Sequence, residues 1–335
     1  MTIREVAKRA GVSLQTVSNV LNGRTSQMGD ETRKRVLETI KELGYYPNAH
    51  ARGLRSQRTR TLGYLTLDPS ARFLSDPFHV AILSGMGDRL REQDYSLLVQ
   101  ALDPEQPEET FNQLFLQRRL DGAVVHLSGS QALRRRCVQQ WTKSGHPFVL
   151  IEEKAKGPNC ACVMAANRKG AERAVEHLVA KGHQQIGFLL PERGWPAVEE
   201  RLEGYKDALQ ALTGSEPRWW TVESEQVEAA RATMDAVLKR EKKLTAVICS
   251  NDVLGLGALQ AAKALGRRIP TEFAIVGFDD FEFARFVEPP LTTVALPGYE
   301  MGRRAVELLL EHLEQKGFTE TEISFATRLI ERGTT

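Results

Sequence analysis

The chain has 335 residues, of which 41% are hydrophobic and 26% charged, and its formal net charge at pH 7 is +2. This is the composition of a soluble globular protein, too long for one small domain and long enough for a large core. No uncharged run approaches membrane-spanning length and the N-terminus has no basic-then-apolar signal, so we expect a cytoplasmic protein without a membrane partner. The four cysteines have neither paired CxxC spacing nor nearby histidine clusters, which favours free thiols over a zinc site or a disulfide framework.

The first residues predict two short helices that flank a glycine. Thr2 and Glu5 have the spacing of a capping box, in which the hydroxyl and the carboxylate each satisfy a free backbone amide, so a helix should cover residues 3–10. Gly11 ends this helix, and residues 14–21 form a second helix whose apolar side chains share one face. Two short helices around a glycine turn make a helix-turn-helix.

The second helix has the composition of a helix that reads DNA. Short amide and hydroxyl side chains cover its non-apolar face, and such groups hydrogen-bond base edges and phosphates in a major groove. A solvated helical hairpin is the alternative interpretation. Charge argues against it, because residues 1–60 hold 12 Lys and Arg against 5 Asp and Glu, a balance of +7 that leaves −5 for the rest of the chain. The predicted DNA contacts in this region are Thr2, Ser13, Leu14, Gln15, Thr16, Ser18, Asn19 and Asn22.

A third helix and a basic segment follow. Residues 30–43 predict a helix that closes a small all-α head. In residues 47–60, Asn48 can cap a helix of about two turns, but so short a helix is marginal in water and Gly53 weakens it further, so we expect it to be disordered until it binds a partner. Leu54 is apolar on a polar, basic segment, which suits a wedge pushed between base pairs from the minor groove. A plain linker is the alternative.

From residue 61 onward, short apolar runs alternate with amphipathic runs of helical length. This alternation indicates parallel sheets, and about eight or more strands with so many crossovers fit two doubly wound lobes better than one. The predicted strands are 62–67, 96–101, 122–127, 147–151, 160–164, 185–190, 245–249 and 273–278. The predicted helices lie near 79–93, 108–118, 131–144, 170–181, 197–212, 227–240, 254–265 and 300–315.

Polar residues follow several of these strands. They are Asp68, Ser128, Glu152-Glu153, Asn251-Asp252 and Asp279-Asp280. Asp and Asn also follow strands because they favour turns and helix caps, so each of them alone has that simpler explanation. Ligands in doubly wound folds bind beyond the carboxyl ends of strands, and the whole set fits a cleft that grips a small polar ligand.

The first two helices also carry a family signature. The string Val6-Ala7…Ala10-Gly11-Val12-Ser13…Thr16-Val17-Ser18…Val20-Leu21-Asn22 resembles that of the LacI/GalR family of bacterial transcription regulators, and matching motifs recur to the end of the chain. The resemblance implies an α/β protein with a small all-α helix-turn-helix head and a two-lobed, periplasmic-binding-protein-like body of doubly wound parallel sheets. The expected domains are a DNA-binding head at 1–46, a hinge helix and linker at 47–60, and an effector-binding and dimerisation domain at 61–335, with an N-lobe at about 61–160 and 292–318 and a C-lobe at about 161–291 and 319–333.

For the basic segment, the resemblance implies a hinge helix that forms only in the DNA-bound dimer. A leucine at the place of Leu54 enters the minor groove in this family, so Asn48, Ala51, Leu54 and Arg55 are expected to contact DNA. Asn19 stands where many members have an arginine that reads guanine, which leaves the base preference of the operator open.

Effector-binding positions also come from the resemblance. Asp76-Pro77-Phe78-His79 resembles the family's Asn-Pro-Phe-Phe, whose aromatic rings stack on a sugar, and Arg201-Leu202-Glu203-Gly204-Tyr205 matches an Arg-x-x-Gly-aromatic motif whose arginine binds ligand hydroxyls. The implied effector-binding residues are Asp76, Phe78, His79, Glu152, Arg201, Trp220, Asn251 and Asp279. Glu152-Glu153, Ala166 and Leu296 depart from the pattern of sugar binders and leave a more acidic cleft.

These features predict a ligand-responsive, sequence-specific transcription regulator, a repressor of carbohydrate-metabolism genes that a sugar-like effector releases from DNA. We expect a homodimer on a near-palindromic double-stranded operator, without a C-terminal coiled coil, because no leucine-heptad tail follows the last helix. The alternatives are a body that senses a phosphorylated carrier-protein co-repressor, and a non-sugar effector such as a nucleobase or another polar metabolite; an amino sugar is open as well. An enzyme is disfavoured because the seven histidines lack partner spacing for a nucleophile-base pair or a metal site, and no cofactor is expected.

Overall fold

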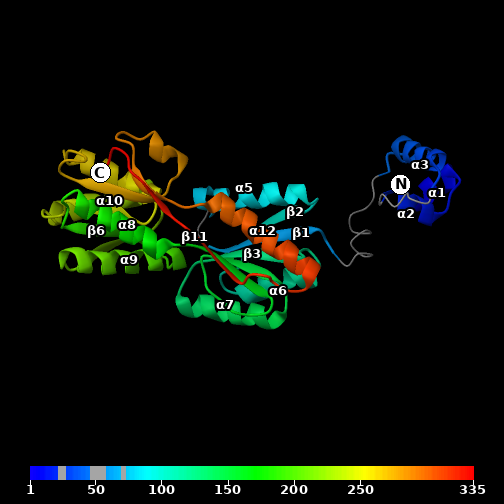
Figure 1. The fold of residues 1–335 in the computed structure, drawn as a ribbon, viewed down its shortest axis with the longest axis horizontal. Coiled ribbons are helices and arrows are strands. Elements are labelled where there is room, and N and C mark those ends of the chain that lie inside the picture. The colour runs from blue at the N-terminus through cyan, green and yellow to red at the C-terminus, as the bar shows by residue number, and fades with distance from the viewer. Residues whose placement is uncertain (22–27, 46–57, 69–72) are drawn as a thin grey trace. The chain divides into compact units, whose positions relative to one another are not determined.

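The computed structural model describes residues 1–21, 28–45, 58–68 and 73–335. It divides the chain into two compact units, Met1–Arg60 and Thr61–Thr335, which we call the head and the body (Figure 1). The predicted contacts Asn22, Asn48, Ala51, Leu54 and Arg55 lie outside the described residues, and most of the predicted hinge does too.

Three short helices form the head. They are α1 (Ile3–Ala10), α2 (Leu14–Leu21) and α3 (Asp30–Glu42). The predicted capping box is confirmed, because the Glu5 amide donates to the Thr2 hydroxyl at 3.4 Å and the Thr2 amide donates to the Glu5 carboxylate at 2.7 Å. Val6, Val17 and Val36, one from each helix, are fully buried together and hold the three helices as one core.

Two six-stranded sheets organise the described part of the body, with the strand orders β11-β5-β4-β3-β1-β2 and β12-β10-β9-β8-β6-β7. The first sheet consists of β1 (Thr61–Leu67), β2 (Ser96–Ala101), β3 (Gly122–Leu127), β4 (Phe148–Ile151), β5 (Cys160–Ala165) and β11 (Glu322–Phe325). The second consists of β6 (Ile186–Pro191), β7 (Arg218–Val222), β8 (Ala246–Cys249), β9 (Ala274–Asp279), β10 (Thr292–Ala295) and β12 (Arg328–Ile330). All pairs are parallel except β10 with β12, so nearly every strand needs a crossover helix and both sheet faces become covered.

The helices lie on both faces of each sheet (Figure 1). The first lobe has α5 (Pro77–Glu92), α6 (Pro107–Leu116), α7 (Gln131–Ser144) and α12 (Gly298–Gln315), and a 3₁₀ turn, η1 (Phe73–Ser75). The second lobe has α8 (Asn167–Ala180), α9 (Pro196–Thr213), α10 (Val227–Arg240) and α11 (Asp252–Ala264), and a 3₁₀ turn, η2 (Glu282–Arg285). None of the described helices is both long and apolar enough to cross a membrane.

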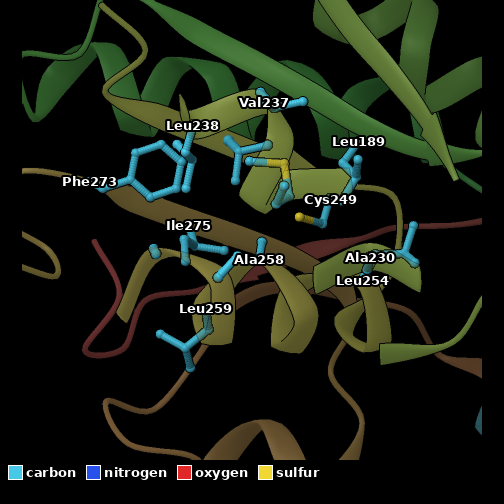
Figure 2. Packing of buried hydrophobic residues seen from close by; sticks show 14 of the residues in the cluster. Leu189, Ala230, Val237, Leu238, Cys249, Leu254, Ala258, Leu259, Phe273 and Ile275 are labelled. Atoms are coloured by element: carbon cyan, nitrogen blue, oxygen red, sulfur yellow. The ribbon is translucent and has the colours of Figure 1, made fainter. Parts of the chain in front are cut away.

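Each sheet separates two apolar cores. In β1, Leu62 and Tyr64 belong to the cluster under α5 and α12, whereas Leu65 and Leu67 belong to the cluster under α6 and α7. Side chains of a strand alternate between faces, so a continuous apolar run is what a strand covered on both sides requires. Figure 2 shows one core of the second lobe, where Phe273 and other apolar side chains from β6, β8, β9, α10 and α11 pack together.

The predicted lobe boundaries are wrong at three places. Residues 160–165 form β5 of the first sheet, so the second lobe does not begin at 161. Residues 292–295 form β10 of the second sheet, although they were assigned to the first lobe. Residues 322–325 form β11 of the first sheet, and only β12 returns to the second. The chain therefore passes between the lobes after β5, after β10 and between β11 and β12, and each passage lies within a few residues of a short strand.

Candidate DNA-reading and effector sites

The outer face of α2 presents amide side chains in a row. Gln15 and Asn19 lie one turn apart, and the Gln15 Nε2 donates to the Asn19 Oδ1 at 2.9 Å. Leu14 beside them is 45% exposed. Ser13 caps the helix, because its hydroxyl accepts the Thr16 amide at 3.0 Å. This face can offer both donors and acceptors to base edges.

One predicted DNA contact on this helix, Ser18, is buried instead of exposed to DNA. Ser18 is only 7% exposed and lies on the buried side of α2 with Val17. A helix turns by about 100° per residue, so Ser18 lies about 60° from Gln15 and about 100° from Asn19, at the border between the amide row and the buried side of α2. The burial of Ser18 therefore disagrees with its predicted contact with DNA.

A cleft opens in the body at the carboxyl ends of the strands. Its larger part, the outer cavity, has a volume of about 440 Å³ and receives Asp68 after β1, Arg193 after β6 and Glu225 after β7. Its smaller part, the inner pocket, is lined by Asp76, Phe78, His126, Trp195, Ala197, Val198, Arg201, Glu225, Ser250, Asn251 and Asp279. Asp76, Glu225 and Asn251 line both parts, so the two spaces adjoin. The lining comes from both sheets, as the prediction from strand ends implied.

Arg201 is fixed in the inner pocket by three acceptors. Its Nε donates to the Asn167 Oδ1 at 2.8 Å, its Nη2 contacts the Asp279 Oδ1 at 3.1 Å, and its Nη1 donates to the Ser250 carbonyl. The guanidinium also lies over the Phe278 ring, 4.5 Å from its centroid. Arg201 is 5% exposed, so its orientation is set before any ligand arrives.

The glycine of the Arg-x-x-Gly motif explains how α9 brings Arg201 to this place. A Cβ at Gly204 would lie 2.3 Å from the backbone oxygen of Arg168, so only glycine permits the close contact of α9 with α8. The same approach places Arg201 beside Asn167, the first residue of α8.

Helix caps position the other polar groups of the cleft. The Asp76 carboxylate accepts the Phe78 amide at 2.8 Å and caps α5. The Asn251 Oδ1 caps α11, and its Nδ2 donates to the Glu225 Oε2 at 2.9 Å. The Trp195 Nε1 donates to the other oxygen of Glu225 at 2.7 Å. These side chains thus combine a structural role with a place in the pocket wall.

Burial changes the proton affinity of the carboxyl groups in the cleft. It raises the pKa of Asp76 to about 6, with the charge of Asp68 as a smaller cause, and that of Asp279 to about 6 despite the Arg201 guanidinium, which lowers it. It raises the pKa of Glu225 to about 7, and the charge of Asp76 adds to the shift.

Three of the predicted effector residues lie elsewhere. His79 is fully buried behind the pocket wall, where its Nε2 is 3.2 Å from the Nδ1 of His126, and it is His126 that lines the pocket. Trp220 lies on β7 and packs in the core of the second lobe, where its ring covers Gly187 of β6. The side chain of Glu152 accepts the Asn167 Nδ2 at 2.8 Å and lies one layer behind Arg201.

The structure also brings residues to the cleft that the sequence did not single out. They are Phe73, His126, Arg193, Trp195, Glu225 and Ser250. Glu225 follows β7, a strand that the apolar pattern did not predict, and strand ends were the signal used. His126 is the penultimate residue of β3, and only the register of that strand turns its ring toward the pocket.

Ion pairs join the two lobes at the rims of the cleft. The Arg193 Nη1 lies 2.5 Å from the Asp68 Oδ1. On α7, Arg134 is 1% exposed, and its Nη2 lies 2.7 Å from Glu199 of α9 while its Nε lies 2.5 Å from Glu153. Within the described ranges there is no group of three or more His, Cys, Asp or Glu side chains that could hold a metal ion. All four cysteines are free and buried.

Comparisons with known proteins agree with this architecture. A family model for bacterial regulatory proteins of the lacI family matches residues 2–48, and a model for periplasmic binding protein-like domains matches residues 175–335. The HTH-type transcriptional repressor PurR of Aliivibrio salmonicida is 31% identical over 318 residues, which cover 94% of this chain and 93% of that protein.

Two solved structures share the fold over the whole chain. The lac repressor dimer bound to operator and the anti-inducer ONPF is 25% identical, with a TM-score of 0.85 and coverage of 100% of this chain and 99% of that one. The complex of the transcriptional regulator CelR with cellobiose is 29% identical, with a TM-score of 0.71 and full coverage of both chains. The predicted fold class and family are confirmed, and the relatives are regulators rather than enzymes. This chain therefore belongs to the lacI family of bacterial regulatory proteins and is a DNA-binding transcription regulator.

Proposed function

We propose that this regulator is a homodimeric repressor whose cleft binds a small polar effector, and that the effector changes how firmly the two heads hold a near-palindromic operator. The support comes from the inner pocket, where side chains of both lobes face one space. A ligand that contacts both lobes favours one arrangement of them over another, and only such a difference in affinity can shift the equilibrium between a DNA-holding and a releasing state. The protein would act in the cytoplasm, on DNA.

The pre-oriented guanidinium of Arg201 is the observation that carries this proposal. A buried arginine held by Asn167, Ser250 and Asp279 costs desolvation energy, and its fork of donors is suited to hydroxyl or carboxylate oxygens of a ligand. The rings of Phe78 and Trp195 form apolar walls beside it. Aromatic walls with a few convergent polar groups suit a hydroxylated ring, and the related CelR was solved with cellobiose.

Homodimerisation is supported by exposed apolar side chains on both lobes. Val80 on α5 is 50% exposed, Leu74 beside it 45%, and Phe286 of the second lobe 76%. Contact with a second copy of the chain would remove the apolar surface of these side chains from water. The related lac repressor was solved as a dimer on its operator, and a two-fold dimer matches a palindromic site because two recognition helices meet successive major grooves.

The test measures DNA binding with and without candidate effectors. An operator is first selected from random duplexes with the full-length protein, and its binding is then followed by fluorescence anisotropy against sugars, amino sugars, sugar phosphates and nucleobases. Arg201→Ala should remove the response to the active compound, because no other described guanidinium lies in the inner pocket. Arg268→Ala is the control, since that side chain is 76% exposed and pairs with Glu272 at the surface.

Two outcomes would contradict the proposal. If Arg201→Ala responds to the effector as the unchanged protein does, the inner pocket is not the effector site. If no compound of the panel alters operator binding, the body does not sense a small molecule of these classes.

A further inference from the structure

The cleft carries more negative charge than its arginines neutralise. Among the described lining residues there are two arginines, Arg193 and Arg201, and each already pairs with a carboxylate, Asp68 at 2.5 Å and Asp279 at 3.1 Å. The carboxylates that line the two spaces are Asp68, Asp76, Glu223, Glu225, Glu228 and Asp279. Four of these six formal charges therefore remain uncompensated by the arginines of the described lining.

The histidines next to the pocket do not offset this charge. Burial lowers the pKa of His79 to about 4. Burial also lowers the pKa of His126 well below its ordinary value, and the neighbouring imidazole of His79 adds to the shift. Both rings are thus neutral near pH 7, and the pair at 3.2 Å is a neutral hydrogen bond.

Three of the carboxylates surround the inner pocket. Asp76 comes from the start of α5, Glu225 from the segment after β7, and Asp279 from the end of β9, so they approach the space from different elements of both lobes. The charge of Asp76 raises the pKa of both Glu225 and Asp279, although burial is the larger cause in each case. Mutually repelling carboxylates in a partly desolvated pocket favour the entry of a cation.

Aromatic rings make up much of the remaining wall. The His126 ring stacks on the Trp195 ring at 4.7 Å between centroids, and the Phe78 ring lies 5.5 Å from His126. The Trp195 indole also donates to Glu225, which ties the ring to the carboxylate. Aromatic faces attract alkylammonium groups, and their methylene neighbours pack on the same faces.

A second observation in the pocket is independent of charge. Ser250 is fully buried and lines the inner pocket, yet its Oγ has no hydrogen-bond partner among the described residues. The Ser250 carbonyl is occupied by Arg201, so the free group is the hydroxyl alone. An unsatisfied buried hydroxyl costs free energy, and an N–H or O–H group of a ligand in the pocket would remove that cost.

We propose that the effector of this regulator is a small amine, and that its ammonium group lies among Asp76, Glu225 and Asp279 while a hydroxylated body contacts Arg201 and the Ser250 hydroxyl. This inference rests on the proposed function, because it takes the cleft to be the effector site. The inference goes beyond the proposed function because it excludes a neutral sugar as the preferred ligand. Amino sugars are the simplest molecules that combine both features.

The experiment compares matched pairs by isothermal titration calorimetry on the full-length protein at pH 7.0. The pairs are D-glucosamine with D-glucose, D-galactosamine with D-galactose, and D-mannosamine with D-mannose. Within each pair, the two sugars differ only by an amine in place of one hydroxyl. We expect at least one amine to bind tenfold or more tightly than its neutral partner. Glu225→Gln should reduce that preference to less than threefold, because the amide keeps the shape but removes the charge. Glu176→Gln, exposed on α8, should leave the preference unchanged.

The outcomes separate this inference from the proposed function. If a neutral sugar binds as well as or better than its amine, the cleft is an effector site but the ammonium assignment is wrong. If the amine preference survives in Glu225→Gln, the carboxylate cluster does not bind the amine. If no member of any pair binds and the wider effector panel is also silent, both the inference and the proposed function fail.

Discussion

Asn167 is the residue that links the crossover between the lobes to the ligand pocket. Its Nδ2 donates to the Glu152 carboxylate at 2.8 Å and its Oδ1 accepts from the Arg201 Nε at 2.8 Å, so one amide holds a buried carboxylate and a buried guanidinium. Burial raises the pKa of Glu152 to about 7, against the lowering effects of Arg201 and Asn167. The family resemblance placed Glu152 on the ligand, whereas the structure makes it a group that supports Arg201 through Asn167.

We predict that Asn167→Ala weakens both folding and effector binding. The change leaves the Arg201 Nε without its acceptor in a site where Asn167 is 3% exposed, and such a loss costs about 1–3 kcal/mol of unfolding free energy. Freed from one of its three partners, Arg201 should also bind the effector less tightly. Urea unfolding and calorimetry check the two effects. Lys169→Ala, two residues along α8 with its side chain 59% exposed, is the control, and equal behaviour of the two variants would contradict the role of Asn167.

At the scale of elements, continuous apolar runs predicted strands such as β3 and β8, whereas the short buried strand β10 was missed and the exposed edge strand β2 was predicted. The β3 run Gly122–Leu127 and the β8 run Ala246–Cys249 are buried throughout, and a continuous apolar run reveals such a strand without knowledge of its partners. In contrast, β7 and β11 are largely exposed edge strands with mixed sequences, and only pairing with a neighbour identifies them. Because β7 was missed, Glu225 at its end was missed too.

Whether an aromatic side chain on a strand faces the cleft or the core depends on the pairing register of that strand, which the sequence alone does not predict. The family resemblance assigned Trp220 to effector binding, but the pairing of β7 with β6 sets Trp220 beside Leu189 and turns its ring over Gly187. A shift of one residue would have placed it on the opposite face. Asp76 and Arg201, which the family resemblance singled out, both line the inner pocket, because their motifs place them near the starts of α5 and α9.

A pair of glycines on α5 tests how closely two elements of the first lobe must approach. A Cβ at Gly85 would lie 1.9 Å from the backbone oxygen of Tyr299 on α12, whereas one at Gly87 would meet nothing within 4 Å. We therefore predict that Gly85→Ala destabilises the body by about 2–3 kcal/mol through overpacking. Gly87→Ala should instead stabilise it by about 0.5–1 kcal/mol, because alanine is the better helix former. Urea unfolding measures both, and a mild effect of Gly85→Ala would mean that α5 and α12 separate easily.

At the scale of the whole molecule, the body contains buried carboxyl groups and buried histidines. Below pH 6.5 these two kinds of group have opposite effects on how the unfolding free energy changes with pH. Buried histidines such as His79, with a folded pKa of about 4, bind fewer protons when folded than when unfolded, so between pH 4 and 6.5 they make the unfolding free energy rise with pH. Buried carboxyls do the reverse. Glu225 and Glu152, with folded pKa values of about 7, keep protons in the folded state that an unfolded chain has lost, so they make the unfolding free energy fall as pH rises from about 4.3.

Above pH 6.5 the histidine effect has ended, and we predict that the unfolding free energy of the ligand-free body falls between pH 6.5 and 8. A carboxyl that titrates near 7 contributes about 1 kcal/mol to this fall. Glu225→Gln should therefore lose about 1 kcal/mol less unfolding free energy than the unchanged protein across this interval, while Glu176→Gln should follow the unchanged curve. All four tryptophans lie in the body, so fluorescence-detected urea unfolding of the full chain reports this unit alone. The same pH course in Glu225→Gln and in the unchanged protein would mean that Glu225 is already ionised in the folded state, and that the cleft tolerates its negative charge without a cation.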